Sequence, residues 1–282
     1  MVAEATRTIT QAPDLYATIN GLKTHYLKVG SGDPILIMHG GSPGAAARVI
    51  YGAAIAPLAA TGFTVYAPDA PGFGLTDFPT DLSVRYRIEH AKAFATEMGL
   101  NHYSVIGNSA GVAPAIWLGL EDPRVANVVV IAGGGIDVPI SPEAQASSRE
   151  HSAFLNAYTP GLENMRTLTH GTLHRDEFVS DELVQLRYEM SIGPNYEARQ
   201  GRNAASTEAL RLLTPDEIKA NYRTRTLICW GKDDHGSVIE RGYRMFEIIP
   251  GAELHAFDNC GHWPMWDQTE RWVSVVSGFL KS

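Results

Sequence analysis

The stretch "HYSVIGNSAGVAP", from His102 to Pro114, decides the fold and the chemistry expected of this chain. An apolar run, "YSVI", breaks at Gly107 and resumes as a helix-like pattern, "AGVAPAIWLGL", directly after Ser109. The spacing G-x-S-x-G holds a serine hydroxyl on a tight turn between a strand and a helix. Small neighbours are needed because the two backbones converge there, and the helix N-terminus offers N–H groups to a developing oxyanion. The stretch therefore predicts that Ser109 is a nucleophile.

Similar apolar runs recur along the chain and predict a buried sheet. They are short and rich in Val, Ile and Leu: "PILIMHGG" (Pro34–Gly41), "FTVYAPDAPGFG" (Phe63–Gly74), "VANVVVIAGGG" (Val125–Gly135), "RTLICWG" and "ELHAFDN". Uninterrupted runs of this kind suit parallel strands that are covered on both faces. A hairpin is expected around Asn20-Gly21, and residues 82–100 place their apolar side chains on one helical stripe. The alternation predicts an α/β fold, with a mostly parallel central sheet flanked by helices.

Residues 139–213 interrupt this alternation. They contain no strand-like run, and helical patterns cover 142–158, 161–170, 180–192 and 203–213. A single crossover between two strands rarely needs a segment of this length. We therefore expect an inserted helical lid over 139–213, between a first part of the core, 1–138, and a second part, 214–282.

A nucleophilic serine needs a base, and the base needs an acid that orients it. In a sheet of this kind the chain order is serine, acid, histidine, with each group after a strand. The run "RTLICWG" leads into Asp233 and Asp234, and "ELHAFDN" leads into His262. The spacing G-x-x-D favours Asp234 as the acid, with Asp233 as the alternative. His262 is the expected base rather than His235 or His39, and we expect His39 to hold its own loop through hydrogen bonds.

The glycine-rich stretch "HGGSPGAAA", residues 39–47, follows an early strand and faces the serine in such a sheet. Backbone N–H groups of Gly41 and Ser42, together with that of Ala110, are the candidate oxyanion donors. A phosphate loop would need a following G-K-[ST], which is missing, and "GFGLTD" lacks the third glycine of a dinucleotide turn. The sequence contains neither H-E-x-x-H nor paired C-x-x-C. We expect no metal and no cofactor.

The amino-acid composition excludes some classes of binding partner. Lys and Arg number 23 against 31 Asp and Glu, which gives a net charge of −8, and no basic block is present. Nucleic acid is therefore not an expected partner, because phosphate binding needs clustered cations. The first residues lack the apolar core of a secretion signal, and no run approaches the roughly 20 apolar residues of a membrane span. Cys229 and Cys260 do not make a disulfide framework. We expect a soluble, cytoplasmic protein with no membrane partner.

These motifs resemble those of the α/β-hydrolase superfamily over nearly the whole chain, and within it the meta-cleavage product hydrolases. The stretches that carry the resemblance are "HGGSPGA", "DAPGFGLTD", "GNSAG", "WGKDD" and "CGHWPMW". Members of that family hydrolyse a C–C bond of 2-hydroxy-6-oxo-hexa-2,4-dienoates from aromatic ring degradation. The resemblance implies the α/β-hydrolase fold and a small-molecule substrate with a carboxylate. It also implies that Arg187, in "DELVQLRYEM", clamps that carboxylate, that Asn108 lies near the 2-oxo group, and that Trp263 packs on the dienoate.

Some positions depart from the family's pattern. Ala110 stands where the family often has methionine, and Arg48 and Ile50 stand where it often has an aromatic residue and an asparagine. The pattern does not indicate the substituent on C6 of the substrate. The same triad would serve a carboxylesterase, a lactonase or an amide hydrolase, and a binding protein without catalysis is a further alternative for this fold. Homo-oligomeric assembly is left open.

Overall fold

Eight strands form one sheet, and the strand before Ser109 lies near its middle. The computed structural model describes residues 7–204 and 211–282. The strands are β1 (Leu15–Ile19), β2 (Leu22–Gly30), β3 (Asp33–Met38), β4 (Phe63–Pro68), β5 (Tyr103–Asn108), β6 (Val125–Ile131), β7 (Arg225–Gly231) and β8 (Glu253–Phe257). Their order is β1-β2-β4-β3-β5-β6-β7-β8. Only the pairs β1–β2 and β2–β4 are antiparallel among these strands, so the mostly parallel sheet is confirmed.

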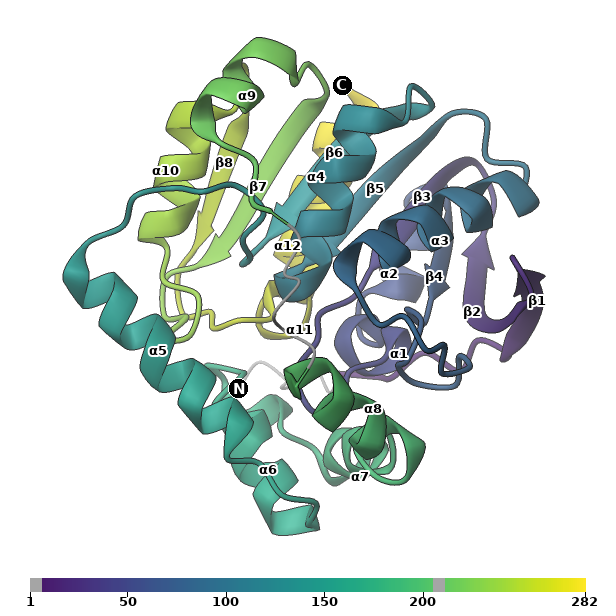
Figure 1. Cartoon of the computed structure of the whole chain (residues 1–282), viewed down its shortest axis with the longest axis vertical. Coiled ribbons are helices and arrows are strands. Elements are labelled where there is room, and N and C mark those ends of the chain that lie inside the picture. Colours follow the sequence, from purple (N-terminus) through teal and green to yellow (C-terminus); the bar gives the residue numbers. More distant parts are fainter. Residues whose placement is uncertain (1–6, 205–210) are drawn as a thin grey trace, which may run out of the picture.

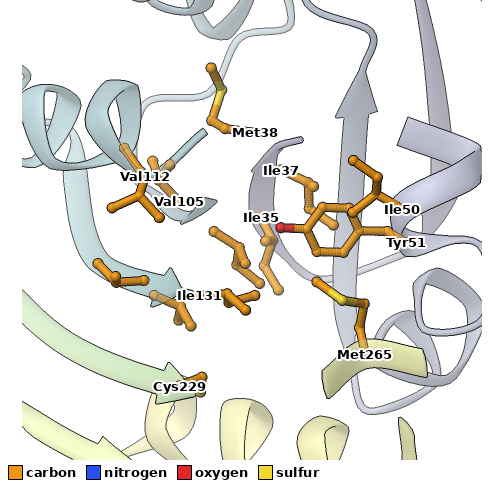
Figure 2. Packing of buried hydrophobic residues seen from close by; sticks show 14 of the residues in the cluster. Ile35, Ile37, Met38, Ile50, Tyr51, Val105, Val112, Ile131, Cys229 and Met265 are labelled. Atoms are coloured by element: carbon orange, nitrogen blue, oxygen red, sulfur yellow. The ribbon is translucent and has the colours of Figure 1, made fainter. Parts of the chain in front are cut away.

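Burial on both faces explains why the central strands are uninterrupted apolar runs. Every residue of β4 and of β5 is buried. Figure 2 shows how neighbouring strands and the helices beside them meet in one cluster, which includes Ile35, Val105, Ile131, Cys229, Ile50, Tyr51 and Met265. Each buried aliphatic side chain of this kind stabilises the fold by about 1.5–3 kcal/mol. The sheet is thus a rigid support for the loops that follow its strands.

Helices cover both faces of the sheet (Figure 1). On one face α4 (Val112–Glu121) packs on β5 and β6, and α3 (Val84–Glu97) packs against α4; on the other, α2 (Ile55–Ala60) contacts β2, β4 and α12 (Thr269–Lys281). The remaining core helices are α1 (Ala47–Tyr51), α9 (Pro215–Asn221), α10 (Glu240–Ile248) and α11 (Pro264–Asp267). The expected flanking of the sheet by helices is therefore confirmed.

Four helices lie between β6 and β7 in the chain: α5 (Pro142–Asn156), α6 (Leu162–His170), α7 (Asp181–Glu189) and α8 (Pro194–Ala204). In Figure 1 they gather beyond the end of the sheet toward which β7 and β8 point. Serine caps begin two of them, since Ser141 accepts a hydrogen bond from the backbone of α5 and Ser180 from that of α7. We call α5–α8 and their connections the lid; its expected limits at 139 and 213 stay a prediction.

The end of the lid differs from the helix expected over residues 203–213. Helix α8 covers 203 and 204, and residues 205–210 lie outside the described part of the chain. Leu213 is not helical, so this part of the prediction is wrong. Its backbone instead bridges to Ile136, with the N–H of Asp137 donating to Leu213 O at 2.8 Å. The bridge ties the two chain segments that enter and leave the lid.

Candidate active site

Ser109 occupies a strained turn directly after β5. Its φ of 53° lies in the left-handed region, and a short 3-10 turn over Ser109–Gly111 leads into α4. A Cβ on Gly107 would lie 2.4 Å from the carbonyl oxygen of Gly111, and one on Gly111 would lie 2.2 Å from that of Met38. The expected convergence of two backbones therefore accounts for both glycines. The turn presents the serine side chain at the carboxyl end of β5.

The acid and the histidine of the predicted triad contact each other. His262 Nδ1 lies 2.7 Å from Asp234 Oδ2, and the other carboxylate oxygen accepts the backbone N–H groups of Gly236 and Ser237 at 2.9 and 2.8 Å. Asp234 is buried, so this bond is shielded from water. Among the described residues, no hydrogen bond joins Ser109 Oγ to the His262 ring. The two side chains instead line one cavity, which brings the three groups to the same edge of the sheet.

The alternatives to Asp234 and His262 have other contacts. Asp233 Oδ2 accepts the backbone N–H of Cys260 at 3.1 Å and does not contact His262. The ring of His39 lies between Gly40 O, 2.7 Å from Nδ1, and the backbone N–H of Ala70, 2.8 Å from Nε2. Because Nε2 accepts from that N–H, Nδ1 carries the proton and donates to Gly40 O. His39 therefore holds its loop, and its ring does not line the cavity.

A cavity of about 570 Å³ opens above Ser109, between the core and the lid. Its walls come from the glycine-rich loop at residues 39–47 (which we call the oxyanion loop), the first turns of α3 and α4, the segment after β6, helix α5 and the segment between β7 and α10. Other hollows border the surface, one of them beside His235, but the described cavity that contains Ser109 and His262 is this one. Its volume is within the usual range for small-molecule sites.

The glycine-rich loop faces the serine turn as expected. A Cβ on Gly40 would lie 3.2 Å from the side chain of Ser109, and one on Gly41 would lie 3.1 Å from the Cβ of Ala110. Gly41, Ser42 and Ala110 all line the cavity. The loop therefore lies beside the serine turn, on the side of the cavity. The role of these three residues as oxyanion donors stays a prediction.

Arg187 is a buried cation with only neutral partners. It lies on α7 with no exposed surface, and its guanidinium donates to Pro43 O, Thr169 Oγ1, Thr172 Oγ1 and Ser42 Oγ at 3.1–3.3 Å. Burial lowers its pKa to about 9, so it is still protonated at neutral pH. Ser42 and Thr172 line the cavity, which places Arg187 one side chain behind the cavity wall.

Asn108 and Trp263 are also buried, and neither lines the cavity. Asn108 Nδ2 donates to Ile131 O at 3.3 Å, and its Oδ1 lies beneath Gly40 with no hydrogen-bond partner among the described residues. The Trp263 ring lies under the guanidinium of Arg187, at 4.8 Å from its centroid. Contact of either residue with a substrate therefore stays a prediction.

The sequence analysis did not predict two further residues at the site, Asp267 and His151. Asp267 is buried and accepts the backbone N–H of Gly261, beside the histidine, as well as those of His174 and Arg175 in the lid. His151 of α5 lines the cavity, with its ring centroid 6.3 Å from that of His262. Asp267 directly follows the quoted "CGHWPMW" and carries no motif signal of its own, and His151 lies on a lid helix whose orientation the sequence does not define.

Within residues 7–204 and 211–282, no group of three or more His, Cys, Asp or Glu side chains is placed to hold a metal ion. None of the helices that the structure describes is long and apolar enough to cross a membrane.

Comparison with known proteins identifies the family and agrees with the fold. A family model described as alpha/beta hydrolase family matches residues 35–275. The chain is 30% identical over 287 residues to 2-hydroxymuconate semialdehyde hydrolase of Pseudomonas putida, covering 96% of this chain and 95% of that protein. It is 28% identical to 2-hydroxy-6-oxo-6-phenylhexa-2,4-dienoate hydrolase of Burkholderia cepacia, covering 93% and 92%. The crystal structure of a meta-cleavage product hydrolase of Pseudomonas fluorescens IP01 superposes with a TM-score of 0.81 at 29% identity, covering 95% of this chain and 97% of that one.

Proposed function

Because the chain belongs to the alpha/beta hydrolase family and its relatives include meta-cleavage product hydrolases, we propose that it hydrolyses the C5–C6 bond of a 2-hydroxy-6-oxo-hexa-2,4-dienoate. The burial of Arg187 is the observation that favours a dienoate substrate over a simple ester. A buried guanidinium without a carboxylate partner is costly unless an anion can approach it. Only Ser42 and Thr172 separate it from the cavity above Ser109. A substrate carboxylate that displaces these hydroxyls gains two charge-assisted hydrogen bonds.

The reaction begins with a proton shift in the bound dienol. The 2-hydroxyl proton moves to C5, with His262 as the carrier, and this gives a 2,6-dioxo acid in which C5 can leave with an electron pair. Ser109 Oγ then bonds to C6 while His262 takes the hydroxyl proton. The backbone N–H groups of Gly41, Ser42 and Ala110 donate hydrogen bonds to the negatively charged C6 oxygen. A single such donor contributes about 3–4 kcal/mol in a comparable hydrolase.

Collapse of this adduct breaks the C5–C6 bond. The electron pair passes into the conjugated 2-oxo fragment, which leaves after taking the proton from His262, and the acyl group stays on Ser109. Water then bonds to the acyl carbon as His262 takes its proton. The acyl C–O bond to Ser109 breaks as His262 returns that proton to Ser109 Oγ, which releases the carboxylic acid. Throughout, Asp234 fixes the tautomer of His262 and stabilises its protonated form.

Stopped-flow measurements with a methyl- and a phenyl-substituted dienoate test the proposal. The dienoate chromophore should decay with purified protein and should persist with Ser109→Ala. If neither chromophore decays while simple esters are hydrolysed, the chain is a carboxylesterase, lactonase or amide hydrolase with the same triad, and the proposal is wrong.

Arg187→Gln tests the carboxylate contact. It should lower kcat/KM for the dienoate by roughly 10- to 100-fold, the range for a lost charged hydrogen bond, and should spare a neutral ester. Arg166→Gln is the matched control, because Arg166 lies on the neighbouring lid helix and pairs with Asp181 at the surface. Equal losses on the dienoate and the ester would count against the clamp.

A further inference from the structure

A second buried arginine lies in the wall of the Ser109 cavity. Arg87 belongs to the first turns of α3 and is only 8% exposed. It lines the cavity beside Val84, and its guanidinium carbon lies 5.8 Å from the centroid of the Phe73 ring. Arg187 borders the same cavity from behind Ser42 and Thr172, which belong to the oxyanion loop and the lid. The two arginines therefore approach the cavity from different helices, Arg87 from α3 and Arg187 from α7.

The charge of Arg87 has no counterpart in the described part of the protein. Its side chain makes no hydrogen bond or ion pair with the described residues, and its Nε is fully buried without an acceptor. Burial lowers its pKa to about 10, with no acidic group opposing that shift, yet it is still protonated at neutral pH. Two residues earlier on the same helix, Arg85 is exposed and pairs with Glu89 and Glu121. A lone cation is costly to bury, so the position of Arg87 is that of an anion-binding group.

The rest of the described wall carries no negative charge, and much of it is apolar. None of its described lining residues is Asp or Glu. Hydroxyl groups line it from Ser148 and Ser152 of α5 and from Ser237, and Arg241 adds a further cation. Burial lowers the pKa of Arg241, but the charge of Asp137 opposes this, so that arginine is partly compensated. Ser152 Oγ already donates to Ser148 O at 2.8 Å, whereas the Arg87 guanidinium would keep no anionic partner beside a purely hydrocarbon substituent.

We propose that Arg87 binds a second carboxylate of the substrate, carried by the substituent on C6. This rests on the proposed function, because the first carboxylate and the reacting C6 carbonyl must already lie between Arg187 and Ser109. The substrate class is then a dienedioate, in which the C6 substituent ends in a carboxylate. Hydrolysis of its C5–C6 bond releases a diacid from the C6 side, in place of the simple carboxylic acid released from an alkyl or aryl substrate.

The test compares two dienoates of equal chain length, one whose C6 substituent ends in a carboxylate and one in which a methyl group replaces that carboxylate. Wild-type protein should show a kcat/KM at least roughly 10-fold higher for the diacid, as expected for a charged hydrogen bond. In Arg87→Met this preference should fall by roughly 10- to 100-fold. Arg85→Met, an exposed position on the same helix, should keep the wild-type preference. Circular dichroism and thermal unfolding of both variants check that they are folded.

The outcomes separate this inference from the proposed function. If wild-type protein hydrolyses both dienoates without preference, or if Arg87→Met is folded and keeps the preference, Arg87 does not bind a second carboxylate while the C–C activity stands. Equal losses of kcat on both dienoates in Arg87→Met would assign Arg87 to the oxyanion region beside Phe73 and Gly41, which also overturns the inference. If neither dienoate reacts with wild-type protein, the proposed function itself fails.

Discussion

Asp233 and Asp234 are adjacent in the chain, yet their carboxylates bond to different groups. Asp234 contacts His262 and two backbone N–H groups, whereas Asp233 accepts from the backbone of Cys260. The side chains of neighbouring residues leave the backbone in different directions, so only one of the pair reaches the histidine. The difference gives a direct test of which aspartate serves the reaction.

Asp234→Asn should lower kcat by on the order of 10³- to 10⁴-fold, as the same change does in a serine protease. An amide can still accept from Gly236 and Ser237, so the loop should keep its shape. Its NH₂ group, however, faces Nδ1 of His262 and favours the wrong tautomer. The measurement is kcat on the dienoate, with the unfolding midpoint as a check on the fold.

Asp233→Asn is the matched control for this prediction. It should change kcat by much less, because Asp233 contacts only the backbone beside Cys260. A larger loss in Asp233→Asn than in Asp234→Asn would reverse the assignment of the acid.

At the residue scale, motif spacing predicted Asp234 and His262 because each follows a strand at a position that the fold defines. The same reasoning did not find Arg87. Its helix was expected from an apolar stripe, and such a stripe indicates which face packs on the core but not which residues of the first turn border a cavity beneath the lid. Asn108 shows the converse, since its place beside the serine in the chain does not direct its side chain toward the cavity.

At the scale of elements, one carboxylate joins the histidine loop to the lid. Asp267 of α11 accepts from Gly261 at 2.7 Å and from His174 and Arg175 at 3.1 and 3.0 Å. The backbone N–H of His262 itself donates to Thr172 O, in the same lid segment. Burial raises the pKa of Asp267, although its backbone hydrogen bonds oppose this. The position of His262 is therefore coupled to that of the lid.

Asp267→Asn should reduce the free energy of unfolding by about 1–3 kcal/mol, because an amide has one acceptor oxygen and must leave a buried N–H without a partner. It should also lower kcat, because Asp267 holds the backbone of Gly261, and a shift of Gly261 would displace the adjacent His262. Urea denaturation and turnover of the dienoate are the two measurements. Asp258→Asn is the control: Asp258 is exposed and pairs with Lys232 at the surface, so little change is expected. Loss of stability in both variants alike would contradict this reading.

The elements themselves were largely predictable, with one informative exception. Capping serines mark where α5 and α7 begin, because a cap acts within a few residues. Leu213 follows a helix-like pattern, but its backbone pairs with the segment after β6. That pairing depends on a contact between distant parts of the chain, which a local pattern does not contain.

Across the whole molecule, a buried histidine ties the N-terminal segment to the sheet and to the loop after β4. His25 of β2 lies 2.7 Å from Asp69 Oδ2 and 2.9 Å from Asp14 Oδ1. Burial alone would lower the pKa of His25, but hydrogen bonds and charges of the two aspartates outweigh it and raise that pKa above 6.5. A raised folded-state pKa stabilises the protein below the unfolded value and loses that contribution as pH rises through the folded value.

The stability lost in His25→Gln should therefore be larger at about pH 6 than at about pH 9, since the protonated ring is present only at the lower pH. The measurement is the difference in free energy of unfolding between wild type and variant at the two pH values. A difference that is constant with pH, or that grows toward alkaline pH, would show that the ring is neutral in the folded state.

The fold of the whole molecule was predictable because strands buried on both faces, such as β4 and β5, are uninterrupted apolar runs in the sequence. The alternation of strands and helices was the second signal. The residues that line the cavity were not predictable. They depend on how the lid meets the core, and the polar wall formed by Ser148, Ser152 and Arg241 comes from segments that are far apart in the sequence. The identity of the residues that line the cavity therefore required the three-dimensional arrangement.

The left-handed backbone of Ser109 has a consequence for how this chain evolves. A residue with a Cβ is disfavoured in that conformation by about 1–2 kcal/mol, and glycine is not. Folding by itself would thus favour a glycine at position 109, and selection for a robust fold and selection for turnover act in opposite directions there. A serine at position 109 therefore carries a conformational cost that only a use of its hydroxyl offsets.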